Sequence, residues 1–348
     1  MKKNKFWLAA MAVTVSMASC SLEEVMEQPE PQAIGFSSFV GKPTRAVTET
    51  KTTSLGSFKV YGGYATNTDV FNGTEVKSSD GINWSYTEAL DLQYWVPGQS
   101  YKFAAMGPSG IDIDTKLSFD YASGHLKLEN YEVTDLATAS KDLVYAEANR
   151  TTDNPLVEAN YAAVPFSFGH IMSWIKIKFV HDLTDKYKIT VSGVKVEGVK
   201  TGATFTGNNV STGTWTEPST AAYLGASADA VKSPDIFSEN VDNNLLDASG
   251  EYCMVDFIAI PQTVATLNIS FKLTVQDDQG SYIVGTSDAP KVFSATALSG
   301  VAWQKDYVYT YTATLDESVL GLKPITFTAT VEDWTNKDNN TGLTIPNP

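Results

Sequence analysis

Arginine is almost absent from this chain of 348 residues: it occurs only at Arg45 and Arg150, and lysine supplies the other basic side chains. A protease specific for arginine would therefore find very few bonds to cut. Cysteine and histidine are also scarce, at two and three residues, and the histidines do not share the spacing of metal ligands. This composition predicts neither a metal site nor a bound cofactor.

Charge is low overall and strongly unbalanced. Charged residues make up 19% of the chain, below the usual share, while 43% are apolar, so we expect sizeable cores rather than disorder. The formal net charge is -15, which disfavours contact with the phosphates of nucleic acid. We expect no nucleic-acid partner.

The sequence motifs of common catalytic sites are missing as well. There is no His-Glu-x-x-His pair, no Gly-x-Ser-x-Gly nucleophile turn and no glycine-rich phosphate loop. Asp112 and Asp114 could form a carboxylate pair, but their alternation around Ile113 is more typical of a solvated strand face or turn. We therefore expect that the chain is not an enzyme.

The first residues have the features of an export signal. Lysines precede a short apolar run, which is too short for a membrane span of about 20 residues. The run ends in Met17-Ala18-Ser19-Cys20, which resembles the lipobox of bacterial lipoproteins, whose cysteine is acylated with groups such as palmitate and begins the mature protein. We predict lipidation at Cys20. The alternative is an ordinary signal peptide with a chance cysteine.

An apolar segment of strand length follows a tether rich in Glu, Gln and Pro. Its apolar positions include Ile34, Phe36 and Val40, and a glycine and a proline end it. Arg45 and Ala46 come next, in a polar loop. A lone arginine in such a loop is usually just solvated, but cutting after this one would detach the strand before it.

Apolar and polar residues alternate through most of the remaining chain. Between residues 267 and 275 every second residue is apolar, and the turn sequence Asp277-Asp278-Gln279-Gly280 predicts a hairpin with a return strand at 281–285. In another strand the alternation shifts phase at Ser192-Gly193, which predicts a β-bulge.

Frequent strands of this kind predict an all-β fold with two tandem antiparallel β-sandwich domains of the transthyretin-like, Greek-key type. Pro97-Gly98 predicts a turn, and hence a hairpin, between 92–96 and 101–106. The expected organisation is a lipoprotein signal peptide at 1–19, a lipidated leader with a removable strand at 20–45, an N-terminal sandwich at 46–163 and a C-terminal sandwich at 164–348.

Several short motifs, together with the lipobox and the Thr44-Arg45-Ala46 step, resemble the fimbrillin family, the subunits of type V pili in Bacteroides-type bacteria. These motifs are Tyr94-Trp95-Val96-Pro97, Tyr101-Lys102-Phe103, Phe166-Ser167-Phe168-Gly169-His170, Ile260-Pro261-Gln262, Tyr307-Val308-Tyr309-Thr310 and Val331-Glu332-Asp333-Trp334. Each motif is weak alone, and their order and spacing carry the resemblance.

The resemblance implies a fimbrial subunit, structural or at the tip, that is exported as an outer-membrane lipoprotein and ends in a fimbrium on the cell surface. It implies cleavage between Arg45 and Ala46 by an arginine-specific surface protease, and displacement of the strand that holds Ile34, Phe36 and Val40. The implied partners are other fimbrial subunits, joined by strand exchange, and a host or bacterial glycan or protein receptor for adhesion.

A surface lipoprotein that binds glycans without polymerising is the alternative function. Aromatic side chains can stack on sugars, although those in alternating strands are more often core residues. Trp215 lies in a polar stretch and is the best candidate for an exposed ring, either as a ligand contact or as a loop anchor.

Overall fold

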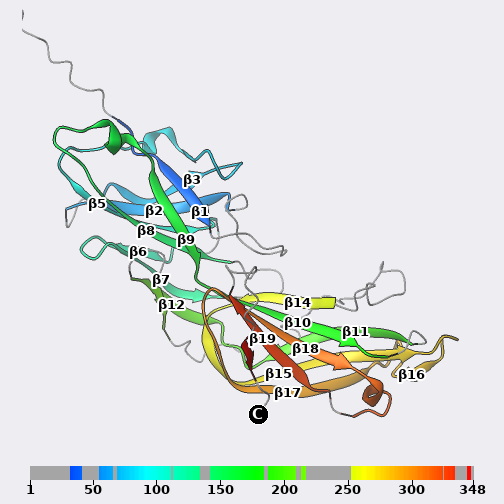
Figure 1. Ribbon diagram of the computed structural model, residues 1–348. Coiled ribbons are helices and arrows are strands. Elements are labelled where there is room, and N and C mark those ends of the chain that lie inside the picture. Colours follow the sequence, from blue (N-terminus) through cyan, green and yellow to red (C-terminus); the bar gives the residue numbers. More distant parts are fainter. Residues whose placement is uncertain are drawn as a thin grey trace, which may run out of the picture. The chain divides into compact units, whose positions relative to one another are not determined.

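The computed structural model is all-β (Figure 1), as the alternation predicted. Its regular elements are strands and three short 3-10 helices, within the residues that the structure describes. No described helix has the length and apolar character needed to cross a membrane. The described residues are 32–40, 55–65, 69–110, 113–133, 142–183, 187–208, 213–216, 252–323, 325–333 and 343–345.

The first sheet is seven-stranded, in the order β1–β9–β8–β5–β2–β3–β4. Its strands are β1 (Phe36–Val40), β2 (Ser57–Tyr64), β3 (Phe71–Lys77), β4 (Ser85–Tyr86), β5 (Ser100–Gly107), β8 (Val144–Thr151) and β9 (Val164–His170). Two of the short 3-10 helices lie between these strands, η1 (Ala89–Asp91) and η2 (Glu158–Tyr161). β1 and β2 follow each other in sequence but are separated in the sheet by β9, β8 and β5.

A smaller sheet of four strands has the order β13–β12–β7–β6. Its strands are β6 (Leu117–Asp120), β7 (His125–Glu132), β12 (Gly202–Gly207) and β13 (Gly213–Trp215). It therefore combines strands from both sides of β8 in the sequence.

The remaining strands form two sheets. One has the order β14–β10–β18–β19–β20, and the other joins β11, β15 and β16, with β17 also paired to β15. Their bounds are β10 (Ser173–His181), β11 (Lys188–Glu197), β14 (Tyr252–Ala259), β15 (Gln262–Gln276), β16 (Tyr282–Val284), β17 (Lys291–Trp303), β18 (Tyr307–Leu315), β19 (Phe327–Asp333) and β20 (Leu343–Ile345), with η3 (Glu317–Val319) after β18.

These last two sheets lie face to face in Figure 1. Phe179 of β10 contacts Phe271 of β15 with 4.7 Å between ring centroids, so the two layers meet through aromatic side chains. Such alternate, inward-facing apolar residues are the basis of a β-sandwich core. The assignment of transthyretin-like, Greek-key topology stays a prediction.

The side chains of β5 point alternately into two different cores. Tyr101, Phe103 and Ala105 belong to the first core, which the seven-stranded sheet builds, whereas Ala104 and Met106 belong to the larger second core. Successive side chains of a strand point to opposite faces, so one strand supports both.

Two local predictions from the sequence are confirmed. The pairing of β11 with β15 shifts register between Ser192 and Lys195, and Gly193 has φ 55°, as expected of a bulge. The backbone N–H of Asp277 donates to the carbonyl of Ser281, and β16 returns along β15, as the hairpin required.

The predicted hairpin between 92–96 and 101–106 is wrong. β5 has β2 and β8 as its neighbours, and Tyr94 instead forms an isolated antiparallel bridge with Ala33. The apolar character of 92–96 comes from Trp95, which packs edge-on against Tyr101 at 4.9 Å.

The division at 163/164 falls at the start of β9. β9 pairs with β1 and β8, so the seven-stranded sheet continues past this point to His170. The division of the chain into the four predicted segments stays a prediction.

Gly198 offers a test of how tightly β11 and β15 approach. A Cβ at this position would lie 2.1 Å from the carbonyl oxygen of Thr266, and φ is +98°. Gly280 also has positive φ, +81°, but nothing lies within 4 Å of its Cβ position. We expect Gly280→Ala to lower the free energy of unfolding by about 1–2 kcal/mol. Gly198→Ala should lower it clearly more, because it adds a clash with the backbone; equal losses in urea titrations would contradict this.

Candidate functional site

The strand β1 lies at the edge of the seven-stranded sheet and pairs with β9 in parallel. The register runs from Phe36 opposite Val164 to Val40 opposite Phe168, and the N–H of Val164 donates to the carbonyl of Gly35 at 2.8 Å. In contrast, the registered pairs of β9 with β8 involve only the last two residues of β9. We call residues 164–168 the β9 wall. The strand that pairs with the backbone of this wall in register is β1.

A second backbone partner holds the residues just before β1. The N–H of Ile34 donates to the carbonyl of Gln93 at 2.8 Å, and the N–H of Trp95 donates to the carbonyl of Gln32 at 3.0 Å. We call residues 93–95 the 93–95 wall. Segment 32–40 thus lies between two backbone walls, antiparallel to one and parallel to the other.

Two apolar side chains of this segment are buried in the first core. Ile34 is 1% exposed and Phe36 is 5% exposed. Phe36 stacks on Phe166 at 5.4 Å and meets the ring edges of Phe71 at 5.2 Å and Phe103 at 5.8 Å. A short strand at the edge of the sheet thereby supplies a ring that contacts three others in the first core.

Tyr86 of β4 adds a side-chain bond to the same segment. Its hydroxyl donates to the carbonyl of Ile34 at 2.5 Å, and its ring lies 6.2 Å from that of Phe36. Burial raises the pKa of Tyr86, with a further contribution from nearby Asp91, so the hydroxyl keeps its proton at neutral pH. The bond to Ile34 therefore persists under physiological conditions.

Three predicted site residues, Cys20, Arg45 and Ala46, lie outside the described residues. Val40 is described as a strand residue through its backbone. Ile34 and Phe36 are brought together in the first core. Lipidation, cleavage and strand displacement stay predictions.

The second arginine has a defined structural position. Arg150 lies in β8 opposite Tyr101, and its guanidinium sits over the Trp95 ring at 5.5 Å. Its Nη1 also donates to the carbonyls of Asn160 and Ala162. A protease binds the residues around the scissile bond as a separate extended strand, and residues already paired in a sheet can adopt that state only after local unfolding. We therefore expect the folded chain to resist cleavage at the Arg150–Thr151 bond.

The 93–95 wall and Tyr86 were missed by sequence reasoning. The 93–95 wall contacts residues some 60 positions away, and no local pattern encodes such a pairing. The buried Trp95 was the only local signal, and it was interpreted as part of a hairpin.

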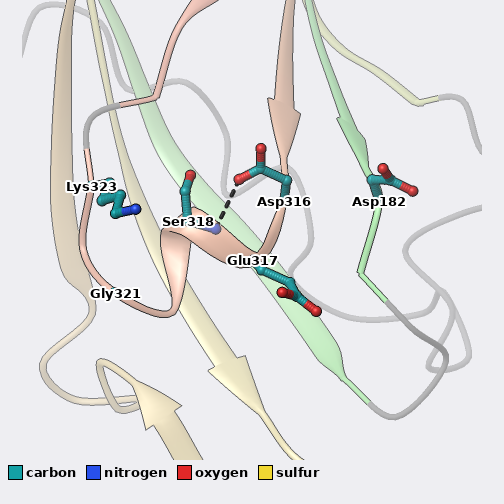
Figure 2. A pocket seen from close by; sticks show the side chains of 6 residues that line it. All are labelled: Asp182, Asp316, Glu317, Ser318, Gly321 and Lys323. Carbon is teal, nitrogen blue, oxygen red and sulfur yellow. Dashed lines mark hydrogen bonds between the residues drawn. The ribbon is translucent and has the colours of Figure 1, made fainter.

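A second place of interest is an open hollow of about 620 Å³, lined by Asp182, Asp316, Glu317, Ser318, Gly321 and Lys323 (Figure 2). Figure 2 shows that these residues come from strand ends and the η3 loop. Asp316 caps η3 by accepting the N–H of Ser318 at 2.9 Å, and its hydrogen bonds with Ser318 lower the pKa of its carboxyl group. This carboxylate has a local structural role.

Two histidine–carboxylate pairs lie elsewhere, and each links separate parts of the chain. Nδ1 of His125 lies 2.9 Å from Glu147, which also accepts a bond from the Tyr145 hydroxyl. Nδ1 of His170 lies 2.7 Å from Asp142, and both side chains are almost fully buried. The first pair links β7 to β8, and the second fixes the end of β9.

Other candidates from the sequence have ordinary structural partners. Asp114 is exposed and forms an ion pair with Lys59 at 3.5 Å, whereas Asp112 lies outside the described residues. Trp215 donates its indole N–H to the carbonyl of Ile171 at 2.6 Å and packs against Phe205, as a loop anchor does. Within the described part of the chain, no group of three or more His, Cys, Asp or Glu side chains is arranged to hold a metal ion.

A family profile described as fimbrillin-like matches residues 44–334. This chain belongs to the fimbrillin-like family. The match covers most of the chain, and it confirms the resemblance drawn from the motifs. No curated protein matches the chain.

Solved structures of low sequence identity share the fold. A fimbrial protein from Bacteroides vulgatus has a TM-score of 0.55 and 18% identity, over 87% of this chain and 100% of that one. A putative cell adhesion protein from Bacteroides ovatus has a TM-score of 0.51 and 15% identity, over 87% and 98%. At such identities the likeness concerns the fold alone, and it covers all of the first relative and nearly all of the second.

Phe36→Ala tests how much the first core depends on β1. Truncating a buried Phe costs about 3–5 kcal/mol, so we expect a loss of this size in the free energy of unfolding of the uncut chain. Ser38→Ala is the matched control on the same strand, because the Ser38 hydroxyl is buried without a hydrogen-bond partner. It should leave stability unchanged or raise it slightly. A loss below about 1 kcal/mol for Phe36→Ala would show that β1 is dispensable to the core.

Proposed function

We propose that this chain is a structural or tip subunit of a cell-surface fimbria, a type V pilus, that assembles by strand exchange and mediates adhesion. Membership of the fimbrillin-like family supports the fimbrial role. The observation that carries the assembly mechanism is the position of segment 32–40: an edge strand that completes the first core and precedes Arg45 in the sequence.

The proposed maturation begins with export as an outer-membrane lipoprotein. Acyl chains on Cys20 hold the precursor at the membrane, since each buried CH₂ contributes about 0.8 kcal/mol. An arginine-specific surface protease then cuts the Arg45–Ala46 bond. Because this bond lies between β1 and β2 in the sequence, cleavage leaves β1 attached to the fold only by non-covalent contacts, and frees the rest of the chain from its lipid.

Selective cleavage follows from the distribution of arginine. Arg45 lies in a polar stretch that also contains a proline and several threonines, whereas Arg150 is held within β8. Lysines are not substrates for such a protease. One bond in the folded chain is therefore susceptible, and the body of the protein survives processing.

Departure of segment 32–40 opens a groove. The β9 wall loses its ladder partner, and Phe166, Phe71 and Phe103 lose the ring that covers them. Unpaired N–H and C=O groups beside apolar surface are the features that accept an added strand. The groove is thus a strong binding site for an extended segment.

A strand from another subunit fills this groove. The donor segment and the groove are different surfaces, so the contact is heterologous and propagates from subunit to subunit instead of closing a dimer. Filament growth follows from this geometry, and adhesion is the biological outcome at the cell surface.

Arg45→Lys tests the proposed processing with little change in charge. An arginine-specific protease does not cut after lysine, so the variant should reach the cell surface but form no filaments in electron micrographs. Arg150→Lys is the matched control and should assemble as the parent does. Filaments of normal abundance from Arg45→Lys would refute maturation at this bond.

A further inference from the structure

We infer that the groove left by segment 32–40 accepts an extended strand of another subunit only in one direction, parallel to β9, and with an aliphatic residue followed two positions later by an aromatic ring. This inference rests on the proposed strand exchange and specifies the partner chemistry of the same site. The supporting observations are the two backbone walls, and the two buried sites that hold the side chains of Ile34 and Phe36.

Direction is set because the groove has two unlike walls. The strand now in place is parallel to the β9 wall and antiparallel to the 93–95 wall. Hydrogen bonds in a parallel ladder are slanted and evenly spaced, whereas those in an antiparallel ladder are perpendicular and alternate in spacing. A reversed strand inverts both relations at once. It would leave backbone groups unpaired in a buried site, where each costs about 1–3 kcal/mol.

Four hydrogen bonds fix the first residues of the occupant. They involve the carbonyl of Gln32, the N–H and carbonyl of Ile34, and the carbonyl of Gly35. Their partners are Trp95 and Gln93 of the 93–95 wall, Tyr86 and Val164, so they come from three separate places along the chain. The partner atoms are backbone atoms except for the Tyr86 hydroxyl, and all four bonds go to backbone atoms of the occupant. These bonds therefore fix the position of the strand without selecting its side chains.

Side-chain selection comes from the two inward sites. The first holds Ile34, which is almost completely buried. The second is surrounded by the rings of Phe71, Phe103 and Phe166, one stacked on Phe36 and two edge-on to it. Aromatic pairs of this geometry contribute about 0.5–1.5 kcal/mol beyond area burial, so an aromatic ring is favoured over an aliphatic side chain in the second site.

The chain itself contains a second segment with this pattern. Residues 34–40 read Ile-Gly-Phe-Ser-Ser-Phe-Val, and residues 325–331 read Ile-Thr-Phe-Thr-Ala-Thr-Val, with Ile, Phe and Val at the same spacing. In its own sheet β19 is paired on both sides, by β18 and β20. A peptide of residues 325–331 is therefore a natural probe of the rule, separate from the sequence that normally occupies the groove.

The test uses the folded full chain cut after Arg45 by an arginine-specific protease. Fluorescent peptides are added in excess, and their exchange with the resident strand is followed by anisotropy. We expect binding of the peptide of residues 32–40 and of the 325–331 peptide. The 32–40 peptide with Phe36→Ala should bind at least about a hundredfold more weakly, and the peptide with the 32–40 sequence reversed should not bind.

Each contrary result overturns a defined part of the inference. Equal binding of the reversed peptide would refute the direction rule. Equal binding of the Phe36→Ala peptide, or no binding of the 325–331 peptide, would refute the side-chain rule. If the cut chain fails to exchange even the 32–40 peptide, strand exchange itself is wrong, and the inference fails with it.

Discussion

The burial of the Phe36 ring is the contact on which the first core depends. This ring comes from a five-residue strand at the sheet edge, yet it lies among Phe71, Phe103 and Phe166 of three other strands. Here a single short segment provides both the ring and the ladder for β9, so its presence decides whether the core is closed.

The order of the strands in the sequence makes the contact of Phe36 depend on the link between β1 and β2. β1 and β2 are consecutive in sequence but are separated in the sheet by three other strands, so the link between them joins strands that are not neighbours. An uncut chain keeps β1 at a high effective concentration beside its groove, and any competing strand is excluded. Once the link is cut, resident and incoming strands compete on equal terms. In the proposed maturation the scarcity of arginine matters, because it would confine the cut to this link.

The sequence predicted what local patterns encode. Alternation gave the all-β class, the bulge at Gly193 and the hairpin after β15, because period, glycine and turn residues act over a few positions. It also predicted a strand over residues 34–40, and β1 occupies Phe36–Val40 of this range. It missed the 93–95 wall and the parallel pairing of β1 with β9, since both join residues far apart in sequence. The hairpin predicted at Pro97-Gly98 was wrong because Trp95 packs on Tyr101 while its backbone pairs with segment 32–40.

The central claim is that β1 leaves the subunit when the pilus forms. The most direct measurement is the N-terminal residue and intact mass of the protein recovered from cell-surface filaments. The account predicts a chain that begins at Ala46, without lipid and without segment 32–40. A lipidated chain that begins at Cys20, with the Arg45–Ala46 bond intact, would contradict it and would favour a membrane-held lipoprotein that keeps its own strand.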